Sequence, residues 1–461
     1  MRAWVSALSA LAVVLALAGC ASVYNLPGNI PLGDALADNN YGREIPRTHE
    51  DDVLLALSFS GGGTRAAAFA FGVLTELDRS RLGSNRERSL LDRVDFVSGV
   101  SGGSVTAAYF GLKRRAALDD FRERFLLRNA EEDLRTRVSL GNIGRALGGG
   151  VNDSQFIDWL DANLFDGARF DAFREDRRPR IWINASDIYN RTPFVFGKTA
   201  FDALCSDIRP YRVAEAVAAS AAVPLAFAPI VLETFPAGCA TQLPAWIERA
   251  RRDPNAQPLL RAFAEANVRY RDGSMRYVKL LDGGLVDNFG LSGFSIGLLA
   301  AQRPFEPMTE LQAAKVRRMM FLVVDSGRGV SGDFAQRLEG PNGVELVSAA
   351  ADTAIDASVR ASFTAFSVLA NDWVGRIRRW RCGLSAADRS RLGVGPNWRC
   401  GDVTLSIDRV NFEQLGPARA GILNAIPTRF ALPADQIDLL VESGADALRQ
   451  NKSYQAFRRG L

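Results

Sequence analysis

The sequence predicts an α/β fold with a mostly parallel central sheet flanked by helices, together with peripheral helical insertions. Short apolar runs that are typical of buried strands occur at residues 53–60, 94–98, 277–281 and 319–325. A glycine-rich turn follows each of the first three runs, and a segment of helical composition follows each of the first two. Strands that alternate with helices in this way favour a parallel sheet with helices on both faces.

The first two strand–helix units carry most of this prediction. Residues 53–60 lie between acidic residues and three glycines, and residues 64–78 then have helical composition. Residues 94–98 lead into a second glycine-rich turn, after which small residues open a helix at 104–113. Both turns therefore connect the carboxyl end of a predicted strand to the start of a predicted helix.

The middle of the chain adds elements of both kinds. Residues 180–188 alternate as a strand does, and residues 193–196 are placed to pair with them. An alanine-rich helix is expected at residues 212–222, where Pro224 stops it. Three stretches look peripheral to the sheet, namely residues 112–178, 230–276 and 327–401, the last with an apolar helix candidate at 344–370.

The composition is ordinary for a globular protein and gives no indication of nucleic-acid binding. Of 461 residues, 47% are hydrophobic and 23% are charged, and the formal net charge is only +4. The basic residues are scattered and lack the aromatic interleaving of a single-strand binder. We therefore expect no nucleic-acid partner, whereas the mild positive bias is compatible with an anionic lipid surface.

The amino terminus has the features of an export signal. Arg2 is followed by an apolar stretch at residues 4–17 that is too short to span a membrane, and this stretch ends in the tetrapeptide LAGC at 17–20. The tetrapeptide resembles the lipobox of bacterial lipoproteins. This resemblance implies that residues 1–19 are a lipoprotein signal peptide and that the Cys20 thiol is lipidated. An ordinary signal peptide with an incidental cysteine is the alternative.

The residues after Cys20 bear on location and attachment. Aspartate is absent from the next two positions, Ala21 and Ser22. By resemblance to sorted lipoproteins, this implies lipid anchoring in the outer membrane of a bacterial envelope. Residues 20–50 are rich in proline, glycine and asparagine, a composition typical of a tether between a lipid and a folded domain.

Cysteine usage fits an exported protein. With Cys20 lipidated, four cysteines remain, and an even number in an oxidising compartment predicts disulfides. Of three possible connectivities we favour the pairs closest in sequence, Cys205–Cys239 and Cys382–Cys400; four buried free thiols are the alternative. The sequence lacks cysteine and histidine spacings typical of zinc, and it has one histidine, so we expect no metal site.

Ser101 is the candidate nucleophile. Gly99, Gly102 and Gly103 surround it in the pattern G-x-S-x-G, which places a serine on a sharp strand-to-helix turn. Glycines suit this turn because side chains at the flanking positions would obstruct its strained backbone. The helix that follows presents its positive dipole end near the serine. An ordinary Gly/Ser turn is the alternative.

The chain's one histidine, His49, precedes Ser101. In α/β-hydrolases the triad histidine follows the serine. A triad in that order is therefore excluded, and either the serine motif is a coincidence or a carboxylate acts as the base.

The three glycines after the first strand are candidates for an oxyanion hole. Gly61, Gly62 and Gly63 present consecutive backbone N–H groups, which an acyl-transfer enzyme needs where a carbonyl oxygen becomes negative. Arg65 could hold this loop in shape or bind an anionic head group. A P-loop is excluded because no Gly-Lys-Ser/Thr follows, and a dinucleotide fingerprint is only half met. A plain helix-start turn remains possible.

Asp282 is the candidate base. It follows the predicted strand at 277–281, and Gly283 and Gly284 after it leave its carboxylate exposed. An aspartate pKa of about 3.9 makes a weak base at neutral pH, but partial burial in an apolar cleft would raise that pKa. Three other aspartates end or follow strands and compete on position alone: Asp187, Asp287 and Asp325.

The three motifs, in this order, resemble those of the patatin-like phospholipase family. The glycine loop is similar to the family's oxyanion motif, Ser101 to its nucleophile, and Asp282 to the aspartate of its D-G-[GA] motif. Residues 214–229 are also similar to the family's helix between the serine and the aspartate. The resemblance covers about residues 53–288, and Ala66 departs from it, since many members have a third glycine there.

The resemblance implies a lipid acyl hydrolase that works with a Ser–Asp dyad on phospholipids or other acyl esters, without a metal or organic cofactor and without calcium. We expect a catalytic core at 51–327 and a C-terminal extension packed on it at 328–461. Two alternatives remain at this stage. One is an acyltransferase or thioesterase with the same dyad, and the other is a catalytically silent, lipid-binding envelope lipoprotein.

Overall fold

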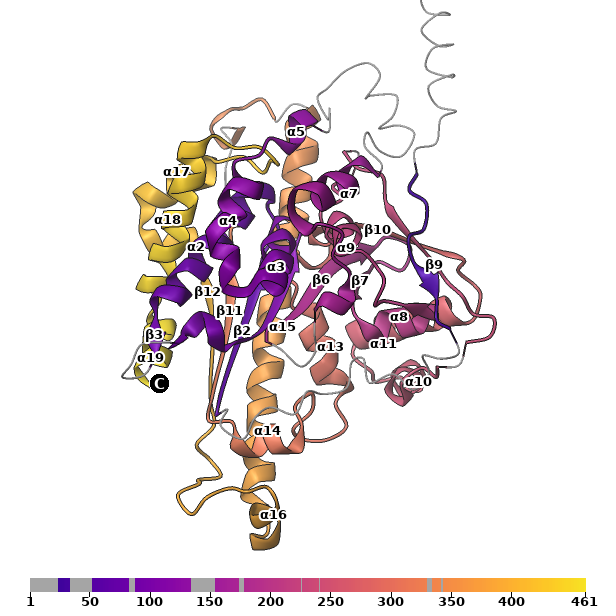
Figure 1. Ribbon diagram of the computed structural model, residues 1–461, viewed down its shortest axis with the longest axis vertical. Coiled ribbons are helices and arrows are strands. Elements are labelled where there is room, and N and C mark those ends of the chain that lie inside the picture. The colour runs from indigo at the N-terminus through magenta and orange to yellow at the C-terminus, as the bar shows by residue number, and fades with distance from the viewer. Residues whose placement is uncertain are drawn as a thin grey trace, which may run out of the picture.

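The computed structural model describes residues 24–33, 52–82, 88–133, 154–173, 178–224, 226–239, 241–329, 334–340 and 343–461 (Figure 1). The expected signal peptide, Cys20 and His49 lie outside the described residues. Among the helices of the described ranges, none combines the length and the apolar character that crossing a membrane requires.

Within the described residues, eight strands form the central sheet in the order β12-β11-β2-β5-β6-β10-β9, and β7 also pairs with β6. Their bounds are β2 Val53–Phe59, β5 Val94–Val100, β6 Arg180–Asp187, β7 Thr192–Phe196, β9 Ile230–Glu233, β10 Tyr277–Asp282, β11 Arg318–Val324 and β12 Thr404–Val410. The strands from β12 to β6 are parallel, whereas β7 and β10 pair antiparallel with β6, and β9 with β10. The predicted fold class is confirmed.

Helices and short strands surround this sheet. The helices are α2 Gly63–Arg79, α3 Gly102–Lys113, α4 Ala117–Phe121, α5 Ala130–Asp133, α7 Gln155–Leu160, α8 Lys198–Leu204, α9 Val213–Ser220, α10 Ala245–Arg252, α11 Pro258–Arg271, α12 Gly284–Asp287, α13 Ser292–Ala300, α14 Glu310–Lys315, α15 Gly343–Cys382, α16 Ala386–Arg391, α17 Pro417–Ala425, α18 Ala434–Gln450 and α19 Lys452–Arg459. The short strands are β1 Ile30–Pro31, paired with β8 Ser206–Asp207, and β3 Arg81–Leu82, paired with β4 Arg88–Ser89.

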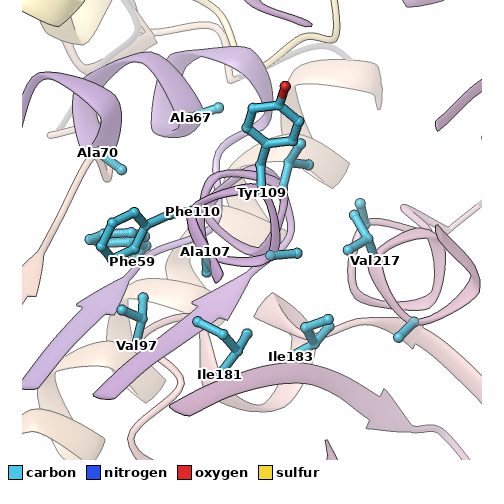
Figure 2. Close-up of a cluster of buried hydrophobic side chains, with 14 of the residues drawn as sticks. Phe59, Ala67, Ala70, Val97, Ala107, Tyr109, Phe110, Ile181, Ile183 and Val217 are labelled. Carbon is cyan, nitrogen blue, oxygen red and sulfur yellow. The ribbon is translucent and has the colours of Figure 1, made fainter. Parts of the chain in front are cut away.

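The central strand β2 shows why its sequence is continuously apolar. All seven of its residues are buried, because the sheet is covered on both faces. Leu55, Leu57 and Phe59 pack in the core on the side of α2 and α3, whereas Leu54 and Ala56 pack in a second core against α13 and α15. Figure 2 shows the first core, where Phe59 and Phe110 lie between the helices and the sheet.

The C-terminal residues take part in the sheet and its cover. β12 is the edge strand next to β11, and α18 lies against α2 so closely that the two backbones touch. A Cβ atom at Gly72 would overlap the carbonyl oxygen of Val441, and one at Gly444 would overlap that of Phe69. Glycine at both positions therefore permits this helix contact. The region at 230–276, expected to be peripheral, supplies the other edge strand, β9, as well as α10 and α11.

Two disulfides join the pairs that sequence proximity favoured. Cys205 at the end of α8 is bonded to Cys239, with a Cα–Cα distance of 5.6 Å, and Cys382 at the end of α15 is bonded to Cys400, with a distance of 4.8 Å. Both distances lie in the usual range for disulfides. The second bond closes the hairpin that contains α16, which extends away from the sheet in Figure 1.

We expect Gly72→Ala to destabilise the protein and Gly297→Ala not to. Both glycines lie in helices, but a Cβ at Gly72 meets backbone of α18 while one at Gly297 meets no atom within 4 Å. Overpacking at Gly72 should lower the free energy of unfolding by about 1–3 kcal/mol, whereas Gly297→Ala should raise it by up to about 1 kcal/mol through helix propensity. Denaturant unfolding of the full chain measures both, and equal effects would show that the α2–α18 contact is not close.

Candidate active site

Ser101 lies on a strained turn between β5 and α3. Its φ of 50° and ψ of −126° lie in a region that residues other than glycine rarely occupy. The turn is held from both sides, because the Ser101 N–H donates to Ser220 Oγ (2.9 Å) and the Ser101 carbonyl accepts from Ser104 Oγ (2.6 Å). Strain that is fixed by such hydrogen bonds is typical of a functional serine.

The glycines next to Ser101 allow the two strand-to-helix turns to touch. A Cβ atom at Gly102 would overlap the carbonyl oxygen of Gly63, and one at Gly103 would meet that of Ser60. The start of α3 thus lies directly against the start of α2. This contact is the physical reason for Gly102 and Gly103, and it places the glycine loop beside the serine.

Asp282 lies opposite Ser101, at the carboxyl end of β10. Asp282 Oδ1 accepts the Gly284 N–H at 2.8 Å. Burial raises the Asp282 pKa to about 6, although the Gly284 N–H and the Ser101 side chain act in the opposite direction. A serine hydroxyl therefore meets a carboxylate that is more basic than an ordinary aspartate.

Ser220, at the end of α9, connects the two halves of this pair. Its Oγ accepts the Ser101 N–H and donates to the Asn184 carbonyl (2.6 Å), while its own carbonyl accepts the Gly283 N–H (3.0 Å). Ser220 enters the sequence-based prediction only as part of the alanine-rich helix expected at 212–222. The signal that could have found it is its position, two residues before the end of that predicted helix.

The three competing aspartates are engaged elsewhere. Asp187, Asp287 and Asp325 each accept backbone N–H groups from residues two to five positions further along, so that each closes a turn after its strand or helix. Within the described part of the chain, Asp282 is the one of these four aspartates whose pKa the Ser101 side chain is seen to lower. The geometry therefore separates four positions that the sequence left equivalent.

The glycine loop adopts a backbone that only glycine accommodates easily. Gly62 has φ 140° and Gly63 has φ 58°. The Gly61 N–H donates to the Asn288 carbonyl at 3.2 Å, whereas the amides of Gly62 and Gly63 donate no hydrogen bond to any described residue. Of the three amides expected to bind an oxyanion, two are therefore available and one is already engaged.

Residues distant in sequence hold this loop in place. The buried Arg65 donates from Nε to the Ser326 carbonyl (3.0 Å) and from Nη1 to the Ile426 carbonyl (2.8 Å). The residue before it, Thr64, donates its backbone N–H to the Arg429 carbonyl (2.8 Å). Burial, together with a neighbouring arginine, lowers the Arg65 pKa to about 10. Of its two expected roles, this geometry favours holding the loop over binding a head group.

Ser326 and Asn288 complete the support, and neither was a candidate in the sequence. Ser326 Oγ donates to the Gly61 carbonyl (3.2 Å), and its N–H donates to Ser60 Oγ (3.0 Å). The Asn288 side chain lies against Gly61 and Gly284, between the loop and the aspartate turn. Ser326 directly follows the strand predicted at 319–325, and Asn288 comes shortly after the glycine turn at 282–284. This position is the one feature of the sequence that could have identified them. In the described ranges, no group of three or more acidic, cysteine or histidine side chains is placed to hold a metal ion.

We expect Asp282→Asn to stabilise the fold above pH 6. The folded-state pKa of about 6 is higher than the ordinary value of about 3.9, so folding favours the protonated form. Stability is therefore full below pH 4, falls as the pH rises from 4 to 6, and stays lower above that. The asparagine variant cannot ionise and avoids this loss. Thermal unfolding at pH 4 and pH 8 measures the difference, and a variant that is no more stable than wild type at pH 8 would contradict the raised pKa.

A search of curated proteins found no match. Among solved structures, a human GIVD cytosolic phospholipase A2 matches at 12% identity with a TM-score of 0.30, over 58% of this chain and 45% of that one. The present chain thus matches less than half the length of that structure.

A family model gives the stronger result. The model for patatin-like phospholipase matches residues 57–294, just over half of the 461 residues. The match contains Ser101, Asp282 and the glycine loop, and it supports a lipid acyl hydrolase. The chain belongs to the patatin-like phospholipase family.

Proposed function

We propose that the protein hydrolyses acyl esters of phospholipids or related lipids, with Ser101 as the nucleophile and Asp282 as the general base. The observation that carries this proposal is the placement of Ser101 on a strained turn that Ser220 ties to the turn of the buried Asp282 carboxylate, whose pKa the Ser101 side chain lowers. A nucleophile in contact with a base, on a strained turn beside free backbone amides, is the arrangement that acyl transfer requires.

In the first step, Asp282 accepts the hydroxyl proton while Ser101 Oγ attacks the ester carbonyl carbon. The raised pKa matters here, because a base with a pKa near the working pH transfers protons most efficiently. With a pKa of about 6, the carboxylate is still about nine-tenths ionised at pH 7. Asp282 thus supplies basicity that histidine provides in other serine hydrolases.

The negative charge on the carbonyl oxygen would be bound by the amides of Gly62 and Gly63. These amides lie at the start of α2, where the helix dipole also favours an anion. The Gly61 amide is assigned a supporting role, because it donates to Asn288. Loss of one such donor typically costs about 10²–10³ in rate.

Collapse of the tetrahedral intermediate breaks the ester bond, and the leaving alcohol takes the proton from Asp282. An acyl group then remains on Ser101 Oγ. Asp282 next accepts a proton from water, whose oxygen attacks the acyl carbon, and the proton returns to Ser101 Oγ as the fatty acid leaves. Each step uses Ser101, Asp282, backbone amides and water, so we expect activity to persist in excess chelator and without calcium.

We also propose that the protein is anchored by lipid at Cys20 in the bacterial envelope, in the outer membrane. The lipobox-like sequence at 17–20 supports the anchor, and the absence of aspartate at Ala21 and Ser22 supports the outer membrane. Two disulfides in one chain are compatible with an oxidising compartment outside the cytoplasm.

Ser101→Ala should abolish ester hydrolysis and labelling by a fluorophosphonate probe while the circular dichroism spectrum stays unchanged. The substitution removes only the attacking oxygen. Ser367→Ala on α15 is the matched control and should label like wild type. Asp282→Asn should label slowly and lower kcat by about 10²–10⁴-fold, as expected for loss of a general base. Equal labelling of Ser101→Ala and wild type would show that another residue is the nucleophile.

Cys20→Ser should release the mature protein from the membrane fraction, or stall it as the uncleaved precursor, without reducing hydrolysis of a soluble ester. Several acyl chains, each methylene adding about 0.8 kcal/mol of membrane affinity, hold a lipoprotein almost permanently. Fractionation of both proteins side by side is the measurement. Mature Cys20→Ser protein that stays in the pellet after a high-salt wash would exclude lipid as the anchor.

A further inference from the structure

The amino-terminal residues 24–33 are fixed to the catalytic domain. Buried Asn25 donates from Nδ2 to the carbonyls of Ala228 (3.2 Å) and Pro229 (3.0 Å). Four residues later, buried Asn29 exchanges hydrogen bonds with the backbone of Glu233, and β1 then pairs with β8. Residues 24–33 of the expected tether are therefore docked on the domain, and they lie beside β9 in Figure 1.

This docked segment is connected to the catalytic pair by a short path. Asn25 binds the loop that starts at Val223, where the Phe227 N–H donates to the Val223 carbonyl. Ala222, just before this loop, accepts the backbone N–H of Asp282 at 2.9 Å. The first described residues of the chain thus rest on the loop that directly follows Ala222, the residue that binds the backbone of the candidate base.

Apolar side chains are exposed along this path. Tyr24 is 64% exposed and Leu26 is 79% exposed, on the side of the extended segment opposite to the buried Asn25. Beside Asp282, Val223 is 39% exposed and Leu285 is 46% exposed. These side chains lie on segments that the Asn25 and Asp282 hydrogen bonds join, and exposed apolar groups gathered in this way mark an interaction surface.

The same segments carry no charge. The exposed residues of the segments 24–33, 221–232 and 283–286 are all uncharged, although 23% of the whole chain is charged. Surfaces that face water normally carry such residues. An uncharged apolar rim around an active site suits contact with the interfacial region of a lipid bilayer, where aromatic and aliphatic side chains insert.

The chain length before Tyr24 fixes where a lipid anchor would lie. Cys20 is four residues away from Tyr24, and four residues span at most about 14 Å. A lipid on Cys20 would therefore hold Tyr24 and Leu26 at the membrane surface, rather than allow the domain to move freely on a tether of some thirty residues.

We propose that Tyr24, Leu26, Val223 and Leu285 form a membrane-contact surface, which turns the active site toward the bilayer in which the chain itself is anchored. This inference rests on the proposed hydrolase function and on lipidation of Cys20. The substrate is then a phospholipid of that same bilayer, taken up from its surface.

The test uses the mature, lipidated full chain reconstituted into vesicles of phosphatidylethanolamine and phosphatidylglycerol. Leu26→Asp should lower hydrolysis of vesicle phospholipid about tenfold, because an ionised carboxylate resists transfer into the apolar interface. Hydrolysis of a soluble short-chain ester should stay unchanged. Leu461→Asp is the matched control, since it alters an exposed leucine at the C-terminus, far from the docked segment in Figure 1, and should change neither activity. A Leu26→Asp variant that hydrolyses vesicle lipid as fast as the control would overturn the proposal of a membrane-contact surface.

A second readout does not depend on activity. A fluorophore attached through Leu26→Cys should be quenched by lipids that carry a quencher near the head group, whereas one attached through Leu461→Cys should not. Equal quenching at both positions, or none at position 26, would overturn the proposal. So would a change from dimer to monomer in Leu26→Asp together with an unquenched probe at Leu26→Cys, since a second copy would then be the occupant. Wild-type protein that cleaves neither substrate would refute the proposed function, and quenching would still decide the membrane contact.

Discussion

Contact between the backbones of two strand-to-helix turns is the constraint on which the active site depends. Gly102 and Gly103 at the start of α3 lie against the carbonyls of Gly63 and Ser60 at the start of α2. No side chain fits between them, so the proposed nucleophile and the proposed oxyanion loop cannot move independently. Preorganised donors of this kind stabilise a developing charge without rearrangement during the reaction. The supporting hydrogen bonds from Arg65 and Ser326 preserve this contact.

Burial of Asp282 links catalysis to stability. The same removal from water that raises its pKa to about 6 makes its ionised form unfavourable in the folded protein. Ser220 holds the serine turn and the aspartate turn together, because it forms hydrogen bonds with the Ser101 N–H and the Gly283 N–H. The ionised Asp282 therefore lowers the stability of the fold at the position where the proposed reaction needs a base. Active sites commonly combine activity with such a loss of stability.

Local pattern was enough to predict β2, β5 and β10 and the turns that follow them, because each is an apolar run that ends in glycines. It did not predict β12, whose residues TLSIDRV are half polar and only partly buried at the sheet edge. It also could not reveal the partners of Arg65, since Ile426 lies 361 positions away in the sequence. Engagement of the Gly61 amide by Asn288 and docking of residues 24–33 likewise depend on tertiary contacts that no local spacing encodes.

The pH dependence of fluorophosphonate labelling tests the role of Asp282 most directly, because labelling reports the nucleophilicity of Ser101 alone. In the full chain, the labelling rate should rise about tenfold per pH unit at low pH and level off above a pKa of about 6. His49→Ala should show the same profile, and Asp282→Asn should be slow without this inflection. An unchanged inflection in Asp282→Asn, or its loss in His49→Ala, would contradict the assignment of Asp282 as the base.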